Sequence, residues 1–559
     1  MSVSTENPMT LSPCRITYLL ACACFLSGVG LELLFGVRGF MPLDHSIVFD
    51  GGWRILNGQI PWREFDLPSA ATPSFIQAWF FQLCGVNWAA YIAHAALFNG
   101  LFCILVFGFL ARLGLDKRWA ALYGACSGAL LFAPVGVPFP EQHAFFFTLL
   151  GVWLFQVGRT ATSGRRALIA LALVPTALLL GFFSKQLPTG LSPLLLVTLL
   201  ALPGARPRVE ALVGMGIGAV LCAGLAGVFL FTTGVEIAGI QHALFDLPMA
   251  AADRRMAFLP STSKMPWHVI QVGLTQGLWS VAALHVIFLT YGGNALFRRR
   301  GNWQVVGGLL LLAELVLLID VVTIVLANNQ DGVGVGWIFL ALAIGQTGVH
   351  QMSESGLRWD RVGSAGSVVI LIVLVRDVIH FSATVNATRI ANDMVFDAGL
   401  ADATTLPDSL WPMRWTTPEH HNFPSEDLVA ILEYLESAEG DFLLVGDTSI
   451  LYGLSGHRSV LPSLWYHPGV TLPAPGSLEF SEWQGRILEN MKPQLAGDGG
   501  QPRAEVLRVV EERAGTWVGN WSVKDLPLVW RSIRGRVQDE VNLGAFRILE
   551  LRPQALGTK

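Results

Sequence analysis

The chain has 559 residues, of which 52% are hydrophobic and only 14% are charged, and its mean hydropathy is +0.51. Soluble domains carry charge on about a quarter of their residues, so a chain made only of soluble domains is excluded. The 37 basic and 41 acidic residues give a net charge of −4, which offers no basic surface for nucleic acid, and we expect no nucleic-acid partner.

Apolar segments close to the length that crosses a bilayer, about 20 residues, recur from Arg15 to about Phe381. The basic residues of the short loops fall on one side of the membrane only if the segment 73–85 does not cross. That segment is also too short to span comfortably, so we predict a helix that lies at the membrane interface. The sequence thus predicts about eleven spanning helices with a cytoplasmic N-terminus. They come from the segments 16–36, 88–111, 119–134, 144–158, 167–183, 188–204, 209–231, 268–291, 303–327, 333–350 and 362–381.

This topology places the longer polar loops on the non-cytoplasmic face, together with everything after Phe381. We therefore predict a transmembrane catalytic domain over residues 1–381 and a soluble periplasmic or extracellular domain over residues 382–559. The second domain reads as α/β. An amphipathic helix follows Ser425, and "GDFLLVGD" and "AFRILELR" have the pattern of short buried strands.

The first outer loop concentrates charged side chains beside the membrane. It contains Asp44, His45 and Asp50, and then the stretch "WRILNGQIPWREF". A carboxylate at a membrane surface can accept a proton from a hydroxyl, and a low-dielectric setting raises its pKa toward a useful range. The residues alone leave open the alternative of a wet interfacial loop held by ion pairs.

The stretch "WRILNGQIPWREF" resembles a pattern in bacterial GT-C superfamily glycosyltransferases of the protein-mannosyltransferase and lipid A aminoarabinose-transferase type. In these proteins an acidic pair precedes a pattern like A-x-R-L-L-x-G-x-x-P-Y-R-D-F, which this chain follows with Trp62 for Tyr and Glu64 for Asp. The spacing places Asp44 and His45 on the acidic pair, so the second position departs from the family. The resemblance implies that Asp44 is the general base, and Asp50 takes that role if the register is shifted.

Two further segments agree with this resemblance. "PFPEQHAFFF" puts Glu141 at the outer end of a membrane helix, where family members often carry a second acid; a helix-capping Glu beside a proline is the alternative. "LGFFSKQLPTG" puts Lys185 and Gln186 at an outer turn, where a charge is costly unless it is paired or faces water. The resemblance implies that Lys185 holds a lipid phosphate with help from Gln186, and a Lys that snorkels to the surface is the alternative.

Three arginines are further candidates for substrate binding. Arg254 and Arg255 lie in the outer loop 232–267, and Arg458 lies in a run similar to the outer domains of bacterial GT-C proteins. A solvated loop and a packing surface are the respective alternatives. We expect no certain cofactor. A divalent metal ion is an open possibility, since Asp44, His45, Glu141 and His143 could gather one if the fold brings them together.

The resemblance implies an inverting glycosyltransferase of the bacterial inner membrane. It would move a sugar from a polyprenyl-phosphate donor in the lipid bilayer to an acceptor hydroxyl of the cell envelope, on the non-cytoplasmic face. It names neither the sugar nor the acceptor. One alternative is a transporter or flippase of a lipid-linked saccharide, which predicts charged pairs deep in several spans; the clear mid-span acids are Glu314 and Asp320. The other is a non-catalytic polysaccharide-assembly protein, for which Asp44 is dispensable.

Overall fold

The structure is a computed structural model of the whole chain. It describes residues 13–37, 45–131, 135–204, 206–249, 279–297, 303–326, 336–353, 368–369, 371–373, 375–376, 406–414, 425–464, 472–493, 504–513 and 522–553.

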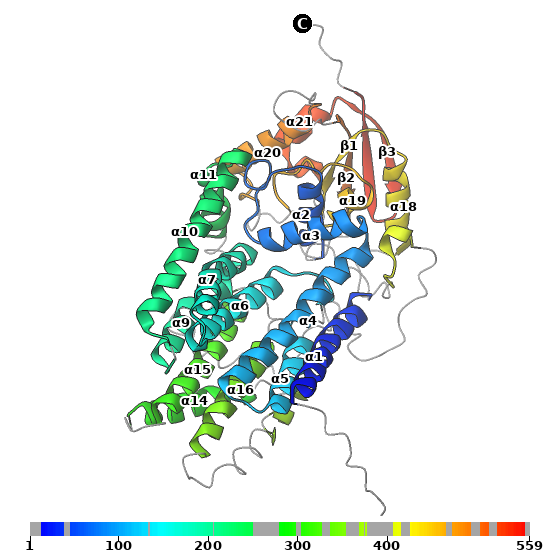
Figure 1. Ribbon diagram of the computed structural model, residues 1–559. Coiled ribbons are helices and arrows are strands. Elements are labelled where there is room, and N and C mark those ends of the chain that lie inside the picture. The colour runs from blue at the N-terminus through cyan, green and yellow to red at the C-terminus, as the bar shows by residue number, and fades with distance from the viewer. Residues whose placement is uncertain are drawn as a thin grey trace, which may run out of the picture.

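Most of the helices before residue 354 pack side by side in one bundle (Figure 1). Five of them, α1, α4, α7, α10 and α15, are long and apolar enough to cross a membrane. The chain is a multi-pass integral membrane protein, as predicted, whereas the count of eleven spans and the orientation stay predictions. The bundle consists of α1 (Pro13–Gly36), α4 (Trp88–Leu113), α5 (Lys117–Leu130), α6 (Pro140–Thr160), α7 (Gly164–Ser184), α8 (Gln186–Thr189), α9 (Ser192–Ala201), α10 (Arg208–Thr233), α11 (Ile237–Gln241), η2 (His242–Asp246), α14 (Trp279–Phe297), α15 (Trp303–Leu326) and α16 (Gly336–Ser353).

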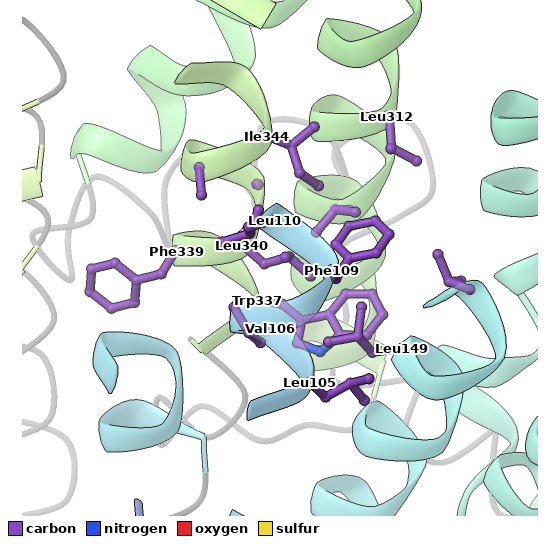
Figure 2. Packing of buried hydrophobic residues seen from close by; sticks show 14 of the residues in the cluster. Leu105, Val106, Phe109, Leu110, Leu149, Leu312, Trp337, Phe339, Leu340 and Ile344 are labelled. Atoms are coloured by element: carbon purple, nitrogen blue, oxygen red, sulfur yellow. The ribbon is translucent and has the colours of Figure 1, made fainter. Parts of the chain in front are cut away.

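The centre of the bundle is an apolar core in which α4 and α16 meet (Figure 2). Phe109 of α4 and Trp337 of α16 are buried there, and the Phe145 ring of α6 lies 4.9 Å from the Trp337 ring. In contrast, α10 leaves apolar side chains such as Leu225 and Phe231 exposed, which suits contact with lipid rather than water.

Two short helices, α2 (Ile47–Leu56) and α3 (Ala71–Cys84), lie between the bundle and the C-terminal domain (Figure 1). With 14 residues, α3 is about 21 Å long, and the hydrocarbon core of a bilayer is about 30 Å thick. Its side chains Phe75, Trp79 and Leu83 form an exposed apolar stripe at intervals of four, while Gln77 is buried. The helix is thus too short to cross the hydrocarbon core, and its place at the membrane interface stays a prediction.

The C-terminal domain contains a four-stranded mixed sheet in the order β1-β2-β4-β3. β1 (Asp441–Val445) runs parallel to β2 (Val506–Glu512), while β4 (Phe546–Leu551) is antiparallel to both β2 and the edge strand β3 (Val537–Leu543). The strands β1 and β4 are the two predicted ones. The other elements are η5 (Asp408–Leu410), α18 (Ser425–Glu436), α19 (Ile450–Leu454), α20 (Leu478–Asn490), η6 (Val523–Asp525) and α21 (Pro527–Ile533).

The sheet separates two apolar cores. Successive side chains of a strand point to opposite faces, so Phe442 and Leu444 join one core and Leu443 and Val445 the other. The second core contains α20 and α21, whereas the first contains α18 and α19 and continues into α2, α3 and the start of α4. The C-terminal domain is therefore packed directly on the first outer loop. The boundary at residue 381 stays a prediction, because residues 377–405 lie outside the described ranges.

Candidate functional site

Two residues from separate outer turns form an ion pair. The ammonium of Lys185, between α7 and α8, donates to the carboxylate Oε1 of Glu141 in the first turn of α6. The Glu141 side chain is 4% exposed and that of Lys185 is 22% exposed, so the carboxylate lies on the inner side and the ammonium reaches the surface. An acid in the first turn of a helix is also favoured by the helix dipole.

The ion pair depends on a break in the chain at Lys185. Helix α7 ends at Ser184, and Lys185 is extended, with φ −160° and ψ 139°. Its backbone N–H still donates to the carbonyl of Gly181 at 3.0 Å, which closes the last turn of the helix. The next residue, Gln186, donates from Nε2 to the carbonyl oxygens of Pro68 at 2.8 Å and Leu244 at 3.3 Å. Gln186 therefore braces this turn against the first outer loop and η2.

The "IPWREF" end of the motif packs beside the same turn. The Trp62 ring lies 5.5 Å from the ring of Phe183 in α7 and 6.2 Å from that of Phe229 in α10. Trp62 has a φ of +63°, which L-residues rarely adopt, and its N–H donates to the carbonyl of Phe65. A tight turn thus places the Trp62 ring against Phe183, which precedes Lys185 by two residues.

The Asp50 carboxylate lies in a sealed contact with the C-terminal domain rather than at an open surface. It pairs with Arg54 at 2.8 Å, and both side chains are 0% exposed. Arg54 also donates to the carbonyl oxygens of Leu461 at 2.6 Å and Ser463 at 3.0 Å. Burial raises the pKa of Asp50 to about 6, and the Arg54 guanidinium opposes that shift. The surroundings of Asp50 are those of a structural ion pair.

Two more ion pairs fasten the first outer loop to the C-terminal domain. Arg458 donates to Glu64 at 2.7 Å, and Arg486 donates to Asp66 at 2.7 Å. The backbone N–H of Asp66 also donates to the carbonyl of Pro462. Arg458 is thus engaged with a residue of the motif, in line with the packing alternative of the sequence analysis.

Several predicted site residues lie outside the described ranges: Asp44, Arg254 and Arg255. His45 is described and buried, and its carbonyl accepts a hydrogen bond from the Tyr91 hydroxyl at 2.9 Å. No group of three or more acidic, histidine or cysteine side chains within the described ranges is arranged to hold a metal ion. His143 in particular uses both ring nitrogens, toward His94 and toward the Phe139 carbonyl. A metal ion at Asp44 stays a prediction.

Three groups were not predicted as site residues. Arg54 follows Asp50 by four positions on α2, which is a visible signal for a helical ion pair. His94 and Gln77 are isolated polar residues in apolar helices and carry no such signal. Glu32 in α1 is a third buried acid within a spanning helix, and its carboxylate has no hydrogen-bond partner among the residues that the structure describes.

No protein-family model and no curated protein matches the chain. Among solved structures, the Archaeoglobus fulgidus oligosaccharyltransferase, in complex with Zn and sulfate, has a TM-score of 0.47 and 11% identity, over 95% of this chain and 73% of that one. The arabinofuranosyltransferase AftD from Mycobacteria has a TM-score of 0.44 and 15% identity, over 98% of this chain and 40% of that one.

ArnT from Cupriavidus metallidurans is similar over 97% of this chain and 100% of its own, at 10% identity. Its TM-score is 0.44 in the apo state and 0.40 when bound to undecaprenyl phosphate. These likenesses extend over nearly the whole chain, at 10 to 15% identity and with TM-scores below 0.5.

Proposed function

We propose that the protein is a membrane glycosyltransferase that takes a sugar from a polyprenyl-phosphate donor and transfers it to an acceptor hydroxyl on the non-cytoplasmic face. The observation that carries this proposal is the Glu141–Lys185 pair at an outer break between apolar helices. The Lys185 side chain is partly exposed, whereas the carboxylate of Glu141 is buried. A cation in this position suits the phosphate of a lipid whose chain remains in the membrane.

The surroundings of Lys185 suit an apolar chain. Half-buried and exposed aromatic side chains gather along the outer ends of α3, α7, α10 and η2, with ring centroids 5.5 to 6.3 Å apart. Rings at a membrane edge accept both an apolar chain and a polar headgroup. The aromatic side chains are Trp62, Phe75, Phe182, Phe183, Phe229 and Phe245.

In the proposed reaction a carboxylate takes the proton of the acceptor hydroxyl, and the hydroxyl oxygen attacks the anomeric carbon. The bond from that carbon to the phosphate oxygen breaks, and its electron pair leaves with the polyprenyl phosphate. Lys185 stabilises the negative charge that develops on the phosphate. The resemblance gives the role of base to Asp44, and the position of Glu141 beside Lys185 makes it the second acid of the site.

A transporter of a lipid-linked saccharide is the second candidate, and polar groups within the bundle favour it. His285 Nδ1 lies 2.8 Å from Glu314 Oε1 between α14 and α15, and Asp320 is fully buried. Polar pairs at such a depth are typical of ion and proton pathways. Loss of the Glu314 carboxylate would stop such a transporter, whereas a transferase with its site at the outer edge would keep its activity.

A sugar-transfer assay tests the proposal. Radiolabelled polyprenyl-phosphate sugars are supplied to membranes that contain wild type, Asp44→Asn, Asp50→Asn, Lys185→Ala or Glu314→Gln at matched levels. We expect transfer by wild type and Glu314→Gln, and its loss with Asp44→Asn and Lys185→Ala. Loss with Asp50→Asn but not Asp44→Asn would shift the register. Transfer that survives both Asp44→Asn and Lys185→Ala would refute the assignment of the site.

A further inference from the structure

Three side chains that the proposed reaction does not use form a hydrogen-bonded chain across the membrane domain. Gln77 of α3, His94 of α4 and His143 of α6 are all 0% exposed. Gln77 Oε1 lies 2.8 Å from His94 Nδ1, and the Nε2 atoms of the two histidines lie 2.8 Å apart. His143 Nδ1 completes the chain at 2.9 Å from the carbonyl oxygen of Phe139.

The partners fix the positions of the protons. The Phe139 carbonyl can only accept, so His143 donates from Nδ1, and the Nε2 of a neutral His143 then accepts from His94. The Nδ1 atom of a neutral His94 then carries no proton and accepts a hydrogen bond. The Gln77 amide donates this bond from Nε2 when it is rotated by 180°, which exchanges the positions of Oε1 and Nε2. If Oε1 faced the His94 ring, the two imidazoles would carry three protons in all and a net positive charge, which is costly in an apolar bundle.

Aromatic rings hold the two imidazoles in place. The Phe80 ring stacks on His94 at 5.0 Å with an interplanar angle of 19°. The Phe98 ring lies 5.3 Å from His94 and 4.4 Å from His143. With their faces covered in this way, the rings have little freedom to leave the chain of hydrogen bonds.

The last member of the chain fastens the turn that carries Glu141. Phe139, the residue before α6, makes no capping hydrogen bond with its side chain, and Pro140 has no N–H. His143 fixes this turn in another way, because both its ring and its backbone N–H donate to the Phe139 carbonyl. The orientation of the first turn of α6 is thus set from His94 and Gln77.

The other end of α3 holds the Lys185 side of the ion pair. The N–H of Ala70 donates to the carbonyl of Ser184 at 2.8 Å, and the Thr72 hydroxyl donates to the carbonyl of Leu180 at 2.7 Å. Both acceptors belong to the last turn of α7, directly before Lys185. The helix α3 therefore contacts the end of α7 before Lys185 directly, and it reaches the first turn of α6 through His94 and His143.

We propose that Gln77, His94 and His143 are positioning residues that hold the Glu141 carboxylate against the Lys185 ammonium. Their effect on catalysis rests on the proposed function, but their effect on the ion pair does not. Loss of the chain releases the first turn of α6, so the ion pair opens and Lys185 becomes more accessible.

The test is chemical labelling of lysines in the full-length protein in lipid nanodiscs. A limiting amount of an amine-reactive reagent is added, and peptide mass spectrometry compares the labelling of Lys185 with that of Lys117. Lys117 lies at the start of α5 and takes no part in the ion pair. Glu141→Gln, His94→Met and Gln77→Met are each expected to raise the labelling of Lys185 several-fold. The matched control is Gln142→Met, a buried residue of the same turn whose amide reaches α4 at Ala95.

Two results would overturn the proposal. One is wild-type labelling in both His94→Met and Gln77→Met while Glu141→Gln raises it; the other is a Glu141→Gln variant that labels like wild type. The conservative variant His94→Gln, whose amide can bridge to His143, is expected to restore part of the protection. A rise in labelling in Gln142→Met equal to that in His94→Met would show general loosening and would also count against a specific chain.

The kinetic consequence is measured separately. In the transfer assay, His94→Met is expected to lower kcat about tenfold or more while the KM for the donor does not rise, because Lys185 still meets the phosphate but Glu141 is misplaced. A rise in KM with unchanged kcat would contradict this. If wild type transfers no sugar, the proposed function fails, and the labelling result still decides whether the chain positions Glu141.

Discussion

Two acid–base pairs of this protein have similar chemistry in opposite settings. Asp50 and Arg54 are 0% exposed and lie under the C-terminal domain, where Arg54 also meets two carbonyl oxygens. Glu141 and Lys185 lie at a break between helices, and the Lys185 side chain is 22% exposed.

The difference separates a structural pair from one that can react. Every donor direction of Arg54 that the structure shows is filled by the protein itself, so a ligand would have to displace the C-terminal domain. Lys185 has one carboxylate partner and an open side, so an anion can approach it without unfolding anything. Access, rather than residue type, is the reason why we propose the Glu141–Lys185 pair as the working site.

The largest expected effect on stability comes from breaking the buried Asp50–Arg54 pair. Arg54→Met leaves the Asp50 carboxylate buried without its partner, and we expect the free energy of unfolding to fall by about 3–5 kcal/mol. Thermal unfolding of the purified protein in nanodiscs measures this. The matched control is Arg63→Met, an arginine after α2 whose side chain is 37% exposed, and this change should alter stability by less than about 1 kcal/mol. Equal melting temperatures for the two variants would contradict the contrast.

Breaking the Glu141–Lys185 pair should affect activity more than stability. Lys185→Met is expected to lower the rate of sugar transfer about 10²- to 10³-fold, because a developing phosphate charge loses its cation. The melting temperature should fall less than with Arg54→Met, since the Lys185 side of the pair is partly solvated. Initial rates at matched membrane levels measure the effect, with Lys117→Met as the control. A Lys185→Met protein that transfers normally would assign the ion pair to structure.

The burial of Asp50 also predicts that the stability of the protein depends on pH. Burial raises the pKa of Asp50 from 3.8 to about 6, so between these values the folded protein holds a proton that the unfolded chain has released. The contribution of Asp50 to stability is therefore largest at low pH and is lost as pH rises through about 6. Asp50→Asn cannot titrate, so its stability relative to wild type should increase from about pH 4 to about pH 7. A difference that is constant or falls with pH would contradict this setting of Asp50.

The smallest effect is expected at the rim of the same interface. Arg486 is 39% exposed and pairs with Asp66, so Arg486→Ala should lower the free energy of unfolding by less than about 1 kcal/mol. High salt should shrink the difference, because exposed charges are screened. Denaturation at low and high ionic strength measures it. A loss of stability as large as with Arg54→Met would show that solvent exposure does not determine how much each ion pair contributes.

Much of the architecture could be predicted because apolar periodicity is a local signal. Most of the predicted membrane helices, the short helix α3 and the strands β1 and β4 lie on their predicted segments. The predicted segment 188–204 is instead divided between α8 and α9, and most of 362–381 lies outside the described residues. The strand β2 was missed because it carries Glu511 and Glu512, which are buried. Glu512 accepts three hydrogen bonds from Asp447 and Thr448, and such distant partners cannot be read from a local pattern.

The candidate site could be predicted residue by residue but not as an arrangement. Glu141 and Lys185 were each placed at an outer turn, yet their pairing depends on how α6 and α7 pack. The sealing of Asp50 depends on carbonyls of the C-terminal domain, far along the chain. The hydrogen-bonded chain through His94 was missed because an isolated histidine in an apolar helix does not reveal its partner.

The central claim is that Lys185 binds a lipid phosphate, and that the Glu141 carboxylate competes with this phosphate for the Lys185 ammonium. Binding of undecaprenyl phosphate to the full-length protein in nanodiscs tests it most directly, with wild type, Lys185→Met and Glu141→Gln compared. We predict that Lys185→Met binds about tenfold more weakly than wild type and that Glu141→Gln binds more tightly, since it frees the ammonium. Equal binding by wild type and Lys185→Met would contradict the account.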